Sequence, residues 1–346
     1  MDGNAMTSTA DSWTAVEHPG LIALDWGTTR LRVFLLDHRG AVAAQREAPW
    51  GIQQLPGTSA AEGFNQAFEG MVGDWLARWP GLPVMASGMV GSAQGWREAP
   101  YLACPIEIAS FHRHLTTVTS LSGTPIHIAP GLVLPSQITS AGSVLADVMR
   151  GEEIQVLGAL SVKPEWAAQS CIVLPGTHSK WVWIEAGKVT HFMTSMAGEL
   201  FAVLRQHSIL GRLMPTAMPA DSAHWAAFEE GLSLAYAAAP GMLISLLFSA
   251  RSRVLTGELS PDESSDYLSG LLIGCELAAA LKQPHGRALT PLGLVGAPEL
   301  SRRYERALGW VGHRPTAVLD NTAPQGLWKV ALSAGLASQL GEAHAA

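Results

Sequence analysis

The sequence predicts an α/β protein made of two like domains, each with a mixed sheet flanked by helices. A pattern of three strands, joined by a small-residue turn and then a glycine turn, occurs at residues 21–45 and again at residues 171–192. Segments with apolar residues at helical spacing follow each copy. Internal similarity of this kind indicates a duplicated domain. The 346 residues of the chain suffice for two domains of ordinary size.

The first copy begins with the apolar strand Leu21–Leu24, and Asp25 follows it directly. A tight turn at Gly27, Thr28 and Thr29 then leads into a second strand with alternating apolar residues. Such a turn offers backbone N–H groups and hydroxyls to an anion. Because a carboxylate would repel a bare phosphate, Asp25 suits a phosphate that arrives with a metal ion.

The second copy has the strand Ile172–Leu174, a turn at Gly176, Thr177 and His178, and two further strands around Gly187. A single hairpin of this kind is usually structural, because turns favour glycine and threonine. Two matched copies instead predict a nucleotide whose phosphates are bound from both sides of a cleft.

The composition argues against several classes of protein. The net charge is -7 and there is no basic run, which argues against nucleic-acid binding. The three cysteines lie far apart and match no metal-binding spacing. No apolar run approaches the roughly 20 residues that a membrane span needs. We therefore expect a cytoplasmic protein that binds neither nucleic acid nor membrane.

The predicted domain boundaries follow changes in composition. Residues 1–19 are small, polar and acidic, so we expect a disordered leader and no signal peptide. Residues 20–168 form the predicted N-terminal domain, and residues 169–346 the predicted C-terminal domain. The polar segment Lys163–Ser170 marks the passage between them. The last predicted helix, Gln325–Leu340, is expected to return toward the cleft.

A glycine-rich segment, Gly88–Trp96, follows the predicted buried strand Leu82–Ser87. Three glycines among small polar residues suit a loop that lies against a ligand. The same residues fit an ordinary strand-to-helix turn equally well, so the segment alone does not decide between the two.

Three helical segments have clear signals. Glu62–Trp79 has apolar residues at three- and four-residue spacing and is predicted as an amphipathic helix with a core-facing aromatic side. Ser260–Glu263 has the pattern of a capping box that starts a helix ending near Leu281. The small residues of Gly293–Ala297 precede Pro298, and such a helix N-terminus allows a flat ring or a phosphate to approach the backbone.

Together these elements resemble the superfamily that contains actin, the heat-shock chaperone ATPases and the sugar kinases. Leu24–Thr29 looks like its first phosphate loop, Leu174–Trp181 like its second, and Gly293–Ala297 like its adenosine loop. The resemblance implies two ribonuclease-H-type domains with an ATP cleft between them, which is the actin-like ATPase fold.

More narrowly, the chain resembles the 2-dehydro-3-deoxygalactonokinase family over residues 20–340. The motifs are DWGTTRLR (Asp25–Arg32), SGMVGSAQGW with APYL (Ser87–Leu102), MRGEE (Met149–Glu153), LPGTHSKW (Leu174–Trp181) and SGLLIGCE (Ser269–Glu276). This resemblance implies Mg²⁺-dependent transfer of the γ-phosphate of ATP to the 6-hydroxyl of 2-dehydro-3-deoxy-D-galactonate. The implied setting is galactonate and galactose catabolism.

The resemblance also implies roles for single residues. Glu152 is the predicted catalytic base and Asp25 the predicted Mg²⁺ ligand, acting through water. Glu153 is the rival base, and either glutamate could instead serve the helix dipole. Pro175 stands where the superfamily commonly has aspartate. The predicted cofactor-binding residues are Gly27, Thr28, Thr29, Gly176, Thr177, His178, Lys180, Gly293, Gly296 and Ala297.

A sugar acid carries a carboxylate, so a cation should face it. The candidate cations are Arg97, Arg150, Arg32 and Lys180, and Lys180 can instead meet the phosphates. The predicted substrate-binding residues are Met89, Gly91, Ser92, Trp96, Arg97 and Arg150. Two alternatives stay open: a kinase for another sugar or sugar acid, and a nucleotide-gated ATPase without a small substrate. The expected partners are ATP and a sugar acid, with a homodimer as an open assembly state.

Overall fold

The computed structural model describes residues 7–9, 16–139, 142–215, 224–281 and 289–338. Contacts between residues divide the chain into two compact units. Unit 1 takes the described residues of Met1–Gln169, Ile184–Phe192 and Asn321–Ala346, and unit 2 takes those of Ser170–Trp183 and Met193–Asp320. Within the described ranges, no helix is long and apolar enough to cross a membrane.

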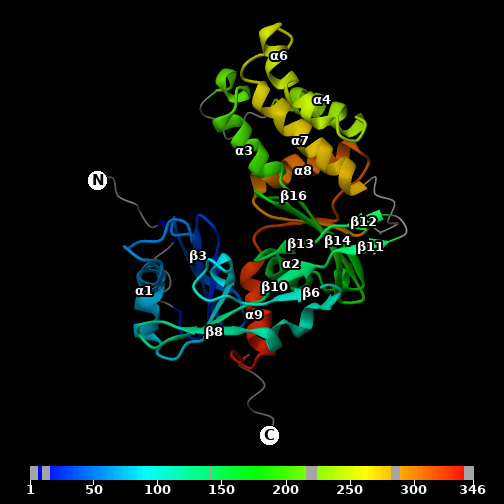
Figure 1. Cartoon of the computed structure of the whole chain (residues 1–346). Helices are drawn as coiled ribbons and strands as arrows, with labels where there is room; N and C mark the ends of the chain where they lie inside the picture. Colours follow the sequence, from blue (N-terminus) through cyan, green and yellow to red (C-terminus); the bar gives the residue numbers. More distant parts are fainter. Residues whose placement is uncertain (1–6, 10–15, 140–141, 216–223, 282–288, 339–346) are drawn as a thin grey trace. The chain divides into compact units, whose positions relative to one another are not determined.

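A seven-stranded sheet forms the centre of unit 1, in the order β1-β4-β3-β2-β5-β9-β8 (Figure 1). Its strands are β1 (Thr7–Thr9), β2 (Pro19–Trp26), β3 (Leu31–Asp37), β4 (Val42–Ala48), β5 (Val84–Gly88), β8 (Thr116–Thr119) and β9 (Pro125–Ile128). Strands β2, β3 and β4 are antiparallel neighbours, whereas β5 runs parallel to β2 and β9 parallel to β5. The sheet is therefore mixed, and the first predicted hairpin is confirmed.

A six-stranded sheet has the order β18-β17-β14-β15-β16-β7. Its strands are β7 (Ile106–Glu107), β14 (Gln169–Leu174), β15 (Ser179–Glu185), β16 (Lys188–Ser195), β17 (Leu292–Val295) and β18 (Ala317–Leu319). Strand β17 runs parallel to β14, and β18 runs parallel to β17. Counted along the chain from β2 and from β14, both sheets share the order third, second, first, fourth. The sixth strand, β9, comes next in the first sheet, and the fifth strand, β18, comes next in the second. The predicted α/β class with a duplicated mixed sheet is confirmed.

Helix α1 (Ala60–Arg78) packs its apolar side on the first sheet, as its residue spacing predicts. The Ser59 side chain caps the helix by accepting a hydrogen bond from the N–H of Glu62 at 3.4 Å. Full burial of a large apolar side chain stabilises a fold by roughly 1.5–3 kcal/mol. The residues of α1 that contribute the most buried volume are Phe64, Phe68, Met71 and Trp75.

The last helix, α9 (Ala323–Ser333), packs in unit 1 against β2 and α2 (Glu152–Val162). Gly40 makes room for it, because a Cβ there would lie 2.4 Å from the ring of Trp328. The predicted domain boundaries instead place this helix in the C-terminal domain, residues 169–346. It belongs to unit 1 because its apolar side chains have their partners there. Residues 339–340 of the predicted helix lie outside the described residues.

The predicted leader contains one strand. Thr7–Thr9 pairs antiparallel with residues 45–47 of β4 at the edge of the sheet. Threonine is β-branched and suits a strand, and the pairing satisfies backbone groups of β4 that would otherwise face solvent. The structure thus differs from a fully disordered leader at these three residues, whereas residues 1–6 and 10–15 lie outside the described part of the chain.

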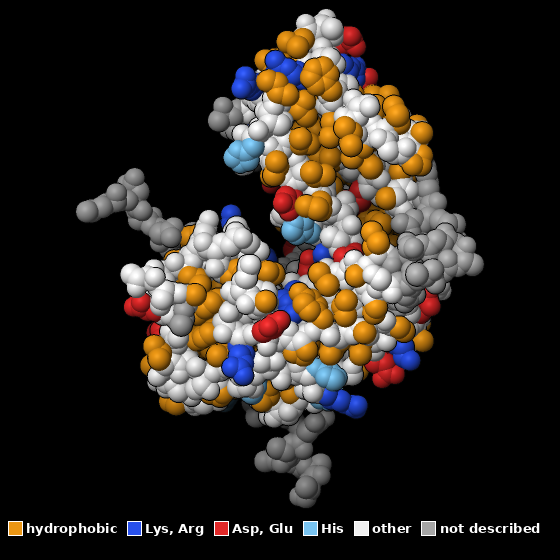
Figure 2. Space-filling view, in the orientation of Figure 1, with side chains coloured by type: hydrophobic (Ala, Val, Ile, Leu, Met, Phe, Trp, Pro, Cys, Tyr) orange, Lys and Arg blue, Asp and Glu red, His pale blue; other side chains and the backbone are white. Residues whose placement is uncertain are grey.

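Unit 2 carries most of the helices. They are α3 (Ala197–His207), α4 (Trp225–Ala237), α5 (Leu243–Leu247), α6 (Ser249–Leu255), α7 (Ser264–Leu281) and α8 (Pro298–Trp310). Helices α5 and α6 are two short helices that meet near Phe248. Hydrophobic side chains gather on the surface of this region (Figure 2). The large exposed ones on or beside α5 and α6 are Met242, Ile244, Phe248 and Leu255.

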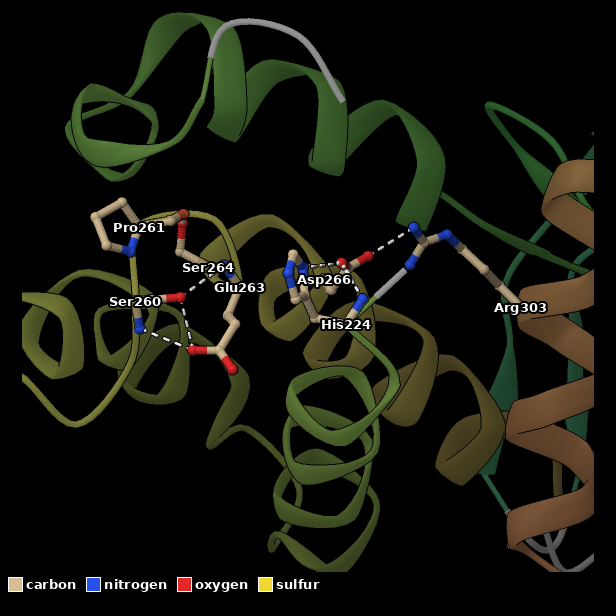
Figure 3. A network of polar contacts seen from close by, with 7 residues as sticks. All are labelled: His224, Ser260, Pro261, Glu263, Ser264, Asp266 and Arg303. Carbon is tan, nitrogen blue, oxygen red and sulfur yellow. Dashed lines mark hydrogen bonds and ion pairs between the residues drawn. The ribbon is translucent and has the colours of Figure 1, made fainter. Parts of the chain in front are cut away.

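The predicted capping box precedes α7 (Figure 3). The N–H and Oγ–H of Ser260 both donate to the Glu263 carboxylate, at 2.9 and 2.7 Å. In return, the N–H of Glu263 donates to Ser260 Oγ at 3.4 Å. This prediction is confirmed, although the regular α-helix begins only at Ser264.

Helices α4 and α7 approach each other closely through glycine. A Cβ added at Gly231, Gly270 or Gly274 would lie between 2.0 and 2.5 Å from a backbone oxygen of the other helix. Real side chains do not tolerate such contacts, so the crossing requires glycine. Two of the three glycines belong to the SGLLIGCE motif, and this packing explains their spacing.

Short elements complete the fold. The 3₁₀ turns are η2 (Met89–Gly91), η3 (Ile108–His114), η4 (Pro164–Ala167) and η5 (Leu210–Leu213). A three-stranded sheet joins β13 (Asp147–Met149), β10 (Gly131–Leu134) and β6 (Tyr101–Ala103), and β11 (Gln137–Thr139) pairs with β12 (Gly142–Val144). Strand β13 matters for the site, because it leads directly into the N-terminus of α2.

Candidate active site

Asp25 lies near the end of β2 and is buried, with 7% of its surface exposed. Its Oδ2 lies 2.7 Å from Nη2 of Arg32 on the neighbouring strand. The side-chain amide of Asn321 donates to the same oxygen at 3.4 Å. Arg32 is therefore paired with Asp25, which makes it a poor candidate for a substrate carboxylate.

The first turn is supported from outside the hairpin. The N–H groups of Ile52 and Gln53 donate to the carbonyls of Gly27 and Thr28, both at 3.1 Å. A Cβ on Gly51 would lie 2.3 Å from the backbone of Thr28, so only glycine fits there. Residues 51–53 thus hold the carbonyl side of the turn, while Thr28 and Thr29 are exposed. No local pattern in the sequence distinguishes Gly51 as a support of this turn.

The end of β5 lies beside the N-terminus of α2. Ser87 pairs with Asp25 in the β2–β5 register. The next residue, Gly88, lies so close to Gly151 that a Cβ on Gly151 would be 3.2 Å from its Cα. Gly151 precedes α2 with a φ of 109°, a conformation that favours glycine. The structure therefore brings Asp25 and the Glu152 end of α2 to the same edge of the first sheet.

The two glutamates at the start of α2 have different surroundings. Glu152 is half-buried, and its carboxylate accepts a hydrogen bond from the N–H of Arg150 at 3.1 Å. Glu153 is only 1% exposed, and both its oxygens accept from the N–H of Gly151, at 2.9 and 2.7 Å. Burial, and secondly the charge of Glu152, raise the pKa of Glu153 to about 8.

Arg150 is a buried cation with unused donors. Its Nη2 donates to the carbonyl of Ala99 at 2.9 Å, and its guanidinium lies 4.1 Å from the ring centroid of Tyr101. Within the described chain, its Nε and Nη1 have no hydrogen-bond partner. A Cβ on Gly91 would come within 3.0 Å of Nη1, so glycine leaves the space for this guanidinium.

Two buried hydroxyls bracket the same glycine-rich turn. The Oγ atoms of Ser87 and Ser92 also have no hydrogen-bond partner among the residues that the structure describes. An unpaired buried polar group is costly, and a set of them at one place suggests a ligand. With Arg150, these hydroxyls give the glycine-rich segment a polar inner side, as a ligand loop requires.

The other predicted substrate residues lie elsewhere. Trp96 stacks on Phe64 with ring centroids 5.6 Å apart and meets Trp26 edge-on at 6.0 Å, so its ring belongs to the core cluster. Arg97 is exposed, and Met89 is half-buried at the start of η2. The glycine-rich pattern could not separate Trp96 from ligand residues, because its aromatic partners come from distant segments.

The second turn is supported by the N-terminus of α3. A Cβ on Gly198 would lie 2.3 Å from the carbonyl oxygen of Gly176. The N–H of Glu199 donates to the carbonyl of Thr177 at 2.8 Å, and its side chain pairs with Nε2 of His178. Both turns thus rest on a glycine contact from a segment outside their own hairpin.

The remaining predicted cofactor residues differ in exposure. Lys180 is buried, and its Nζ donates to Oγ1 of Thr194 at 2.8 Å. Gly293 lies inside β17, buried between β14 and β18, so its place is structural. Gly296 lies close to Pro175, because a Cβ on Gly296 would be 3.3 Å from the carbonyl oxygen of Pro175. Ala297 is the N-cap residue of α8.

A cavity of about 220 Å³ lies in unit 2 beside the second turn. Gly176 and Ala297, two of the predicted cofactor residues, line it. The other lining residues come from α3, α7 and α8, and they are Ala197, Gly198, Phe201, Ser269, Leu272, Ile273, Glu299, Leu300, Arg303 and Tyr304. The wall is mainly apolar with a few polar groups, which is typical of a small-molecule site.

Arg303 in this wall is held by a buried network (Figure 3). Its Nη2 lies 2.6 Å from the carboxylate of Asp266, which also accepts from the N–H of His224 at 2.8 Å. The guanidinium also lies over the rings of Trp225 and Phe228. The sequence carries no local signal for this network, because its members are spread over α4, α7 and α8.

The donor set fits a Mg²⁺ ion that arrives with phosphate. No group of three His, Cys, Asp or Glu side chains able to hold a metal occurs in the described ranges. Mg²⁺ keeps much of its water shell and is often bound by one or two carboxylates together with phosphate oxygens. Asp25, buried beside the first turn, can supply such a carboxylate.

The chain is similar to known proteins over most of its length. A family model described as 2-keto-3-deoxy-galactonokinase matches residues 25–330. The 2-dehydro-3-deoxygalactonokinase of Escherichia coli (strain K12) is 36% identical over 307 residues, which cover 88% of this chain and 94% of that protein. A Rhizobium meliloti (strain 1021) protein, named as a probable 2-dehydro-3-deoxygalactonokinase, is 34% identical over 296 residues, or 86% and 91% of the two chains.

A solved structure agrees with these matches. The crystal structure of a Sinorhizobium meliloti protein, assigned by its own description to the 2-dehydro-3-deoxygalactonokinases, has a TM-score of 0.77 and 33% sequence identity. The match covers 90% of this chain and 98% of that chain. Since the family model spans far more than half of the sequence, this chain belongs to the 2-keto-3-deoxy-galactonokinase family.

Proposed function

We propose that this chain is an ATP-dependent kinase that phosphorylates the 6-hydroxyl of 2-dehydro-3-deoxy-D-galactonate, with ADP as the second product. Membership of the family and the names of the curated relatives support the activity and the substrate. The observation that carries the substrate class is the buried Arg150, whose Nε and Nη1 have no partner in the described part of the chain. The proposed setting is galactonate catabolism in the cytoplasm.

In this proposal Arg150 binds the carboxylate of the sugar acid. A buried donor without a partner costs about 1–3 kcal/mol, and more when it is charged. A carboxylate removes that cost through charge-assisted hydrogen bonds. The unpaired hydroxyls of Ser87 and Ser92 are then available to the oxygen atoms of the sugar. A neutral hexose would leave Arg150 unpaired, so the site discriminates against it.

We assign the general base to Glu152. A base must be ionised to accept a proton, and a carboxyl with a pKa of about 8, as for Glu153, is mostly protonated at neutral pH. Glu152 is half-buried at the start of α2. It takes the proton of the 6-hydroxyl as the bond from that oxygen to the γ-phosphorus forms and the bond to the bridging oxygen of ADP breaks.

The cavity beside the second turn is the proposed adenosine site. Its apolar walls suit a flat base, and the turn at Gly176–His178 offers donors to phosphate oxygens. The exposed turn at Gly27–Thr29 is assigned to the transferred phosphate. Mg²⁺ bound to the phosphates, with Asp25 as a ligand through water, would neutralise their charge. A homodimer remains part of the proposal, to be checked by light scattering.

A coupled ADP-release assay tests the function. We expect the highest rate with 2-dehydro-3-deoxy-D-galactonate, a lower rate with its gluconate epimer and none with galactose, which has no carboxylate. A preference for a different sugar acid would reassign the substrate within the same reaction. ATP hydrolysis that no sugar acid stimulates would instead favour a nucleotide-gated ATPase.

The variant Arg150→Met tests the carboxylate site. Losing a charged hydrogen-bond donor is worth about 1.5–3 kcal/mol, so the KM for the sugar acid should rise roughly 10–100-fold. The KM for ATP should stay near its normal value. Arg97→Met is the matched control, because Arg97 is exposed. Equal KM values in both variants would remove Arg150 from the proposed site.

A further inference from the structure

Glu276 on α7 is a buried carboxylate, only 3% exposed, that has no role in the proposed reaction. Its Oε1 accepts a hydrogen bond from Nε1 of Trp181 at 2.8 Å. Its Oε2 is contacted by Oγ of Ser179 at 3.1 Å and by the hydroxyl of Tyr304 at 2.9 Å. These partners come from β15 and α8, and Ser195 at the end of β16 also hydrogen-bonds to the carboxylate, so one side chain connects α7 with three other elements.

Glu276 continues the face of α7 that lines the cavity. Ser269, Leu272 and Ile273 are lining residues, and Glu276 follows them at a spacing of three, four and seven residues. Residues with this spacing share one side of a helix. Tyr304, which donates to Glu276, is also a lining residue. The carboxylate therefore lies directly behind the wall of the cavity.

The partners of Glu276 fix the elements on both sides of that cavity. Ser179 is the residue that follows His178, so its hydrogen bond holds the point where the second turn enters β15. Tyr304 lies on α8, whose N-cap residue is Ala297. The distance between the second turn and α8 depends on both contacts.

The number of protons indicates how the network is joined. Oγ of Ser179 and the hydroxyl of Tyr304 are also 2.8 Å apart, so three oxygens form three contacts. Two hydroxyls supply only two protons, so all three contacts are hydrogen bonds when Glu276 is protonated and donates to one of the hydroxyls. Burial raises the pKa of Glu276, which agrees with a neutral carboxyl in this place.

We infer that Glu276 is a positioning residue for the nucleotide: it sets the spacing between the second turn and α8 without touching ATP. This inference rests on the proposed assignment of the cavity to adenosine. Removal of the carboxyl leaves buried donors unpaired and lets the two walls separate, which weakens nucleotide binding. The sugar acid, bound in unit 1, is unaffected.

The test compares Glu276→Leu with Glu276→Gln in the full chain. Loss of one or two buried hydrogen bonds corresponds to about a tenfold or larger rise in the KM for ATP in Glu276→Leu. Its KM for the sugar acid should not change. Glu276→Gln should recover most of the lost affinity, because an amide nitrogen donates where the protonated oxygen did. Equal losses in both variants would contradict the inference.

Two further variants separate positioning from loss of stability. Tyr304→Phe removes one hydroxyl and little volume, so it should fold even where Glu276→Leu does not, and its KM for ATP should rise about fivefold. Leu268→Ala, at a buried apolar position of α7, should lower the melting temperature without changing the KM for ATP. An unchanged ATP affinity in folded Tyr304→Phe would overturn the inference.

Calorimetry with a non-hydrolysable ATP analogue distinguishes this failure from failure of the proposed function. If the unaltered protein does not bind the analogue, the assignment of the cavity to adenosine is wrong. If it binds, and Glu276→Leu and Tyr304→Phe bind equally well, only the role of Glu276 is wrong.

Discussion

The two turns are copies in backbone design and differ in chemistry. Each follows the first strand of the repeated three-strand pattern, and each is held by a glycine from outside its hairpin, Gly51 for the first turn and Gly198 for the second. The first turn has the buried carboxylate of Asp25 before it, whereas the second has Pro175. A duplicated scaffold thus keeps its backbone support and changes the charged group. This difference supports the proposed division of roles, in which the first copy carries the catalytic charges and the second the nucleotide contacts.

The largest expected effect tests this division at Glu152. Glu152→Gln keeps the size of the side chain but cannot accept the proton, so kcat should fall by about 10²–10⁴-fold with little change in ATP affinity. Glu199→Gln is the matched change in the first turn of α3, beside the second turn, and should alter kcat far less. Steady-state kinetics on both variants measures this.

Two outcomes would contradict the assignment of the catalytic charge to Glu152 in the first copy. If Glu199→Gln lost as much kcat as Glu152→Gln, the catalytic charge would not be confined to the first copy. If Glu153→Gln lost the activity while Glu152→Gln kept it, the base would move one residue along α2.

A smaller effect is expected at Asp25. Asp25→Asn should lower kcat by about 10–100-fold and shift the Mg²⁺ titration to higher concentration, since charge stabilisation by a metal is worth several kcal/mol. Asp37→Asn on the same hairpin is the control. The Asp37 carboxylate accepts from the N–H groups of Arg39 and Ala41, a purely local turn. A normal Mg²⁺ titration for Asp25→Asn would exclude the metal role.

The supporting glycines sharpen the comparison through stability. Gly51→Ala and Gly198→Ala should each destabilise the fold by about 1–3 kcal/mol, because the new Cβ would lie 2.3 Å from backbone atoms of a turn. We expect Gly198→Ala also to raise the KM for ATP, and Gly51→Ala mainly to lower kcat. Gly73→Ala within α1 is the control, because its Cβ would have only an ordinary contact at 3.5 Å. Denaturant unfolding and steady-state kinetics measure these effects. If Gly51→Ala and Gly198→Ala had the same stability and kinetic constants as Gly73→Ala, the proposed support of the turns would be contradicted.

A further expected effect is the dependence of stability on pH. The pKa of Glu153 is raised from 4.5 to about 8, so the folded state binds a proton that the unfolded state has released. Its contribution is fully present below pH 4.5 and is lost as the pH rises through 8. The slope should be at most about 1.4 kcal/mol per pH unit for this group. Glu153→Gln should flatten the dependence between pH 5 and 8, and Glu165→Gln, at an exposed position, should not. If the stability of the unaltered protein and of both variants changed equally with pH, this linkage would be ruled out.

Much of the fold could be predicted because its signals are local. Alternating apolar residues, glycine at turns and the capping box of Ser260 and Glu263 depend on neighbours within a few positions. The repeated pattern of three strands in each sheet could be predicted for the same reason. The membership of α9 in unit 1 could not, because it depends on apolar partners more than 100 residues away, such as those of α2.

The candidate site could be predicted only in part. The sequence offers four candidate cations for the carboxylate, and burial and pairing separate them: Arg32 is paired with Asp25, Lys180 donates to Thr194, and Arg97 is exposed. Only Arg150 combines burial with unpaired donors among those four. The glycine-rich segment around Trp96 predicts a substrate-binding residue, whereas its ring stacks on Phe64 in the core.

The α/β class, the two hairpins and the candidate roles of Asp25 and Glu152 follow from the sequence alone, because each depends on a motif within one short segment. Tertiary structure decided which charged groups are buried, which are paired and which keep unused donors. The network of Glu276, for example, joins residues separated by 28 to 125 positions. Burial and hydrogen-bond pairing are properties of atoms brought together across the chain, and no local pattern in the sequence encodes them.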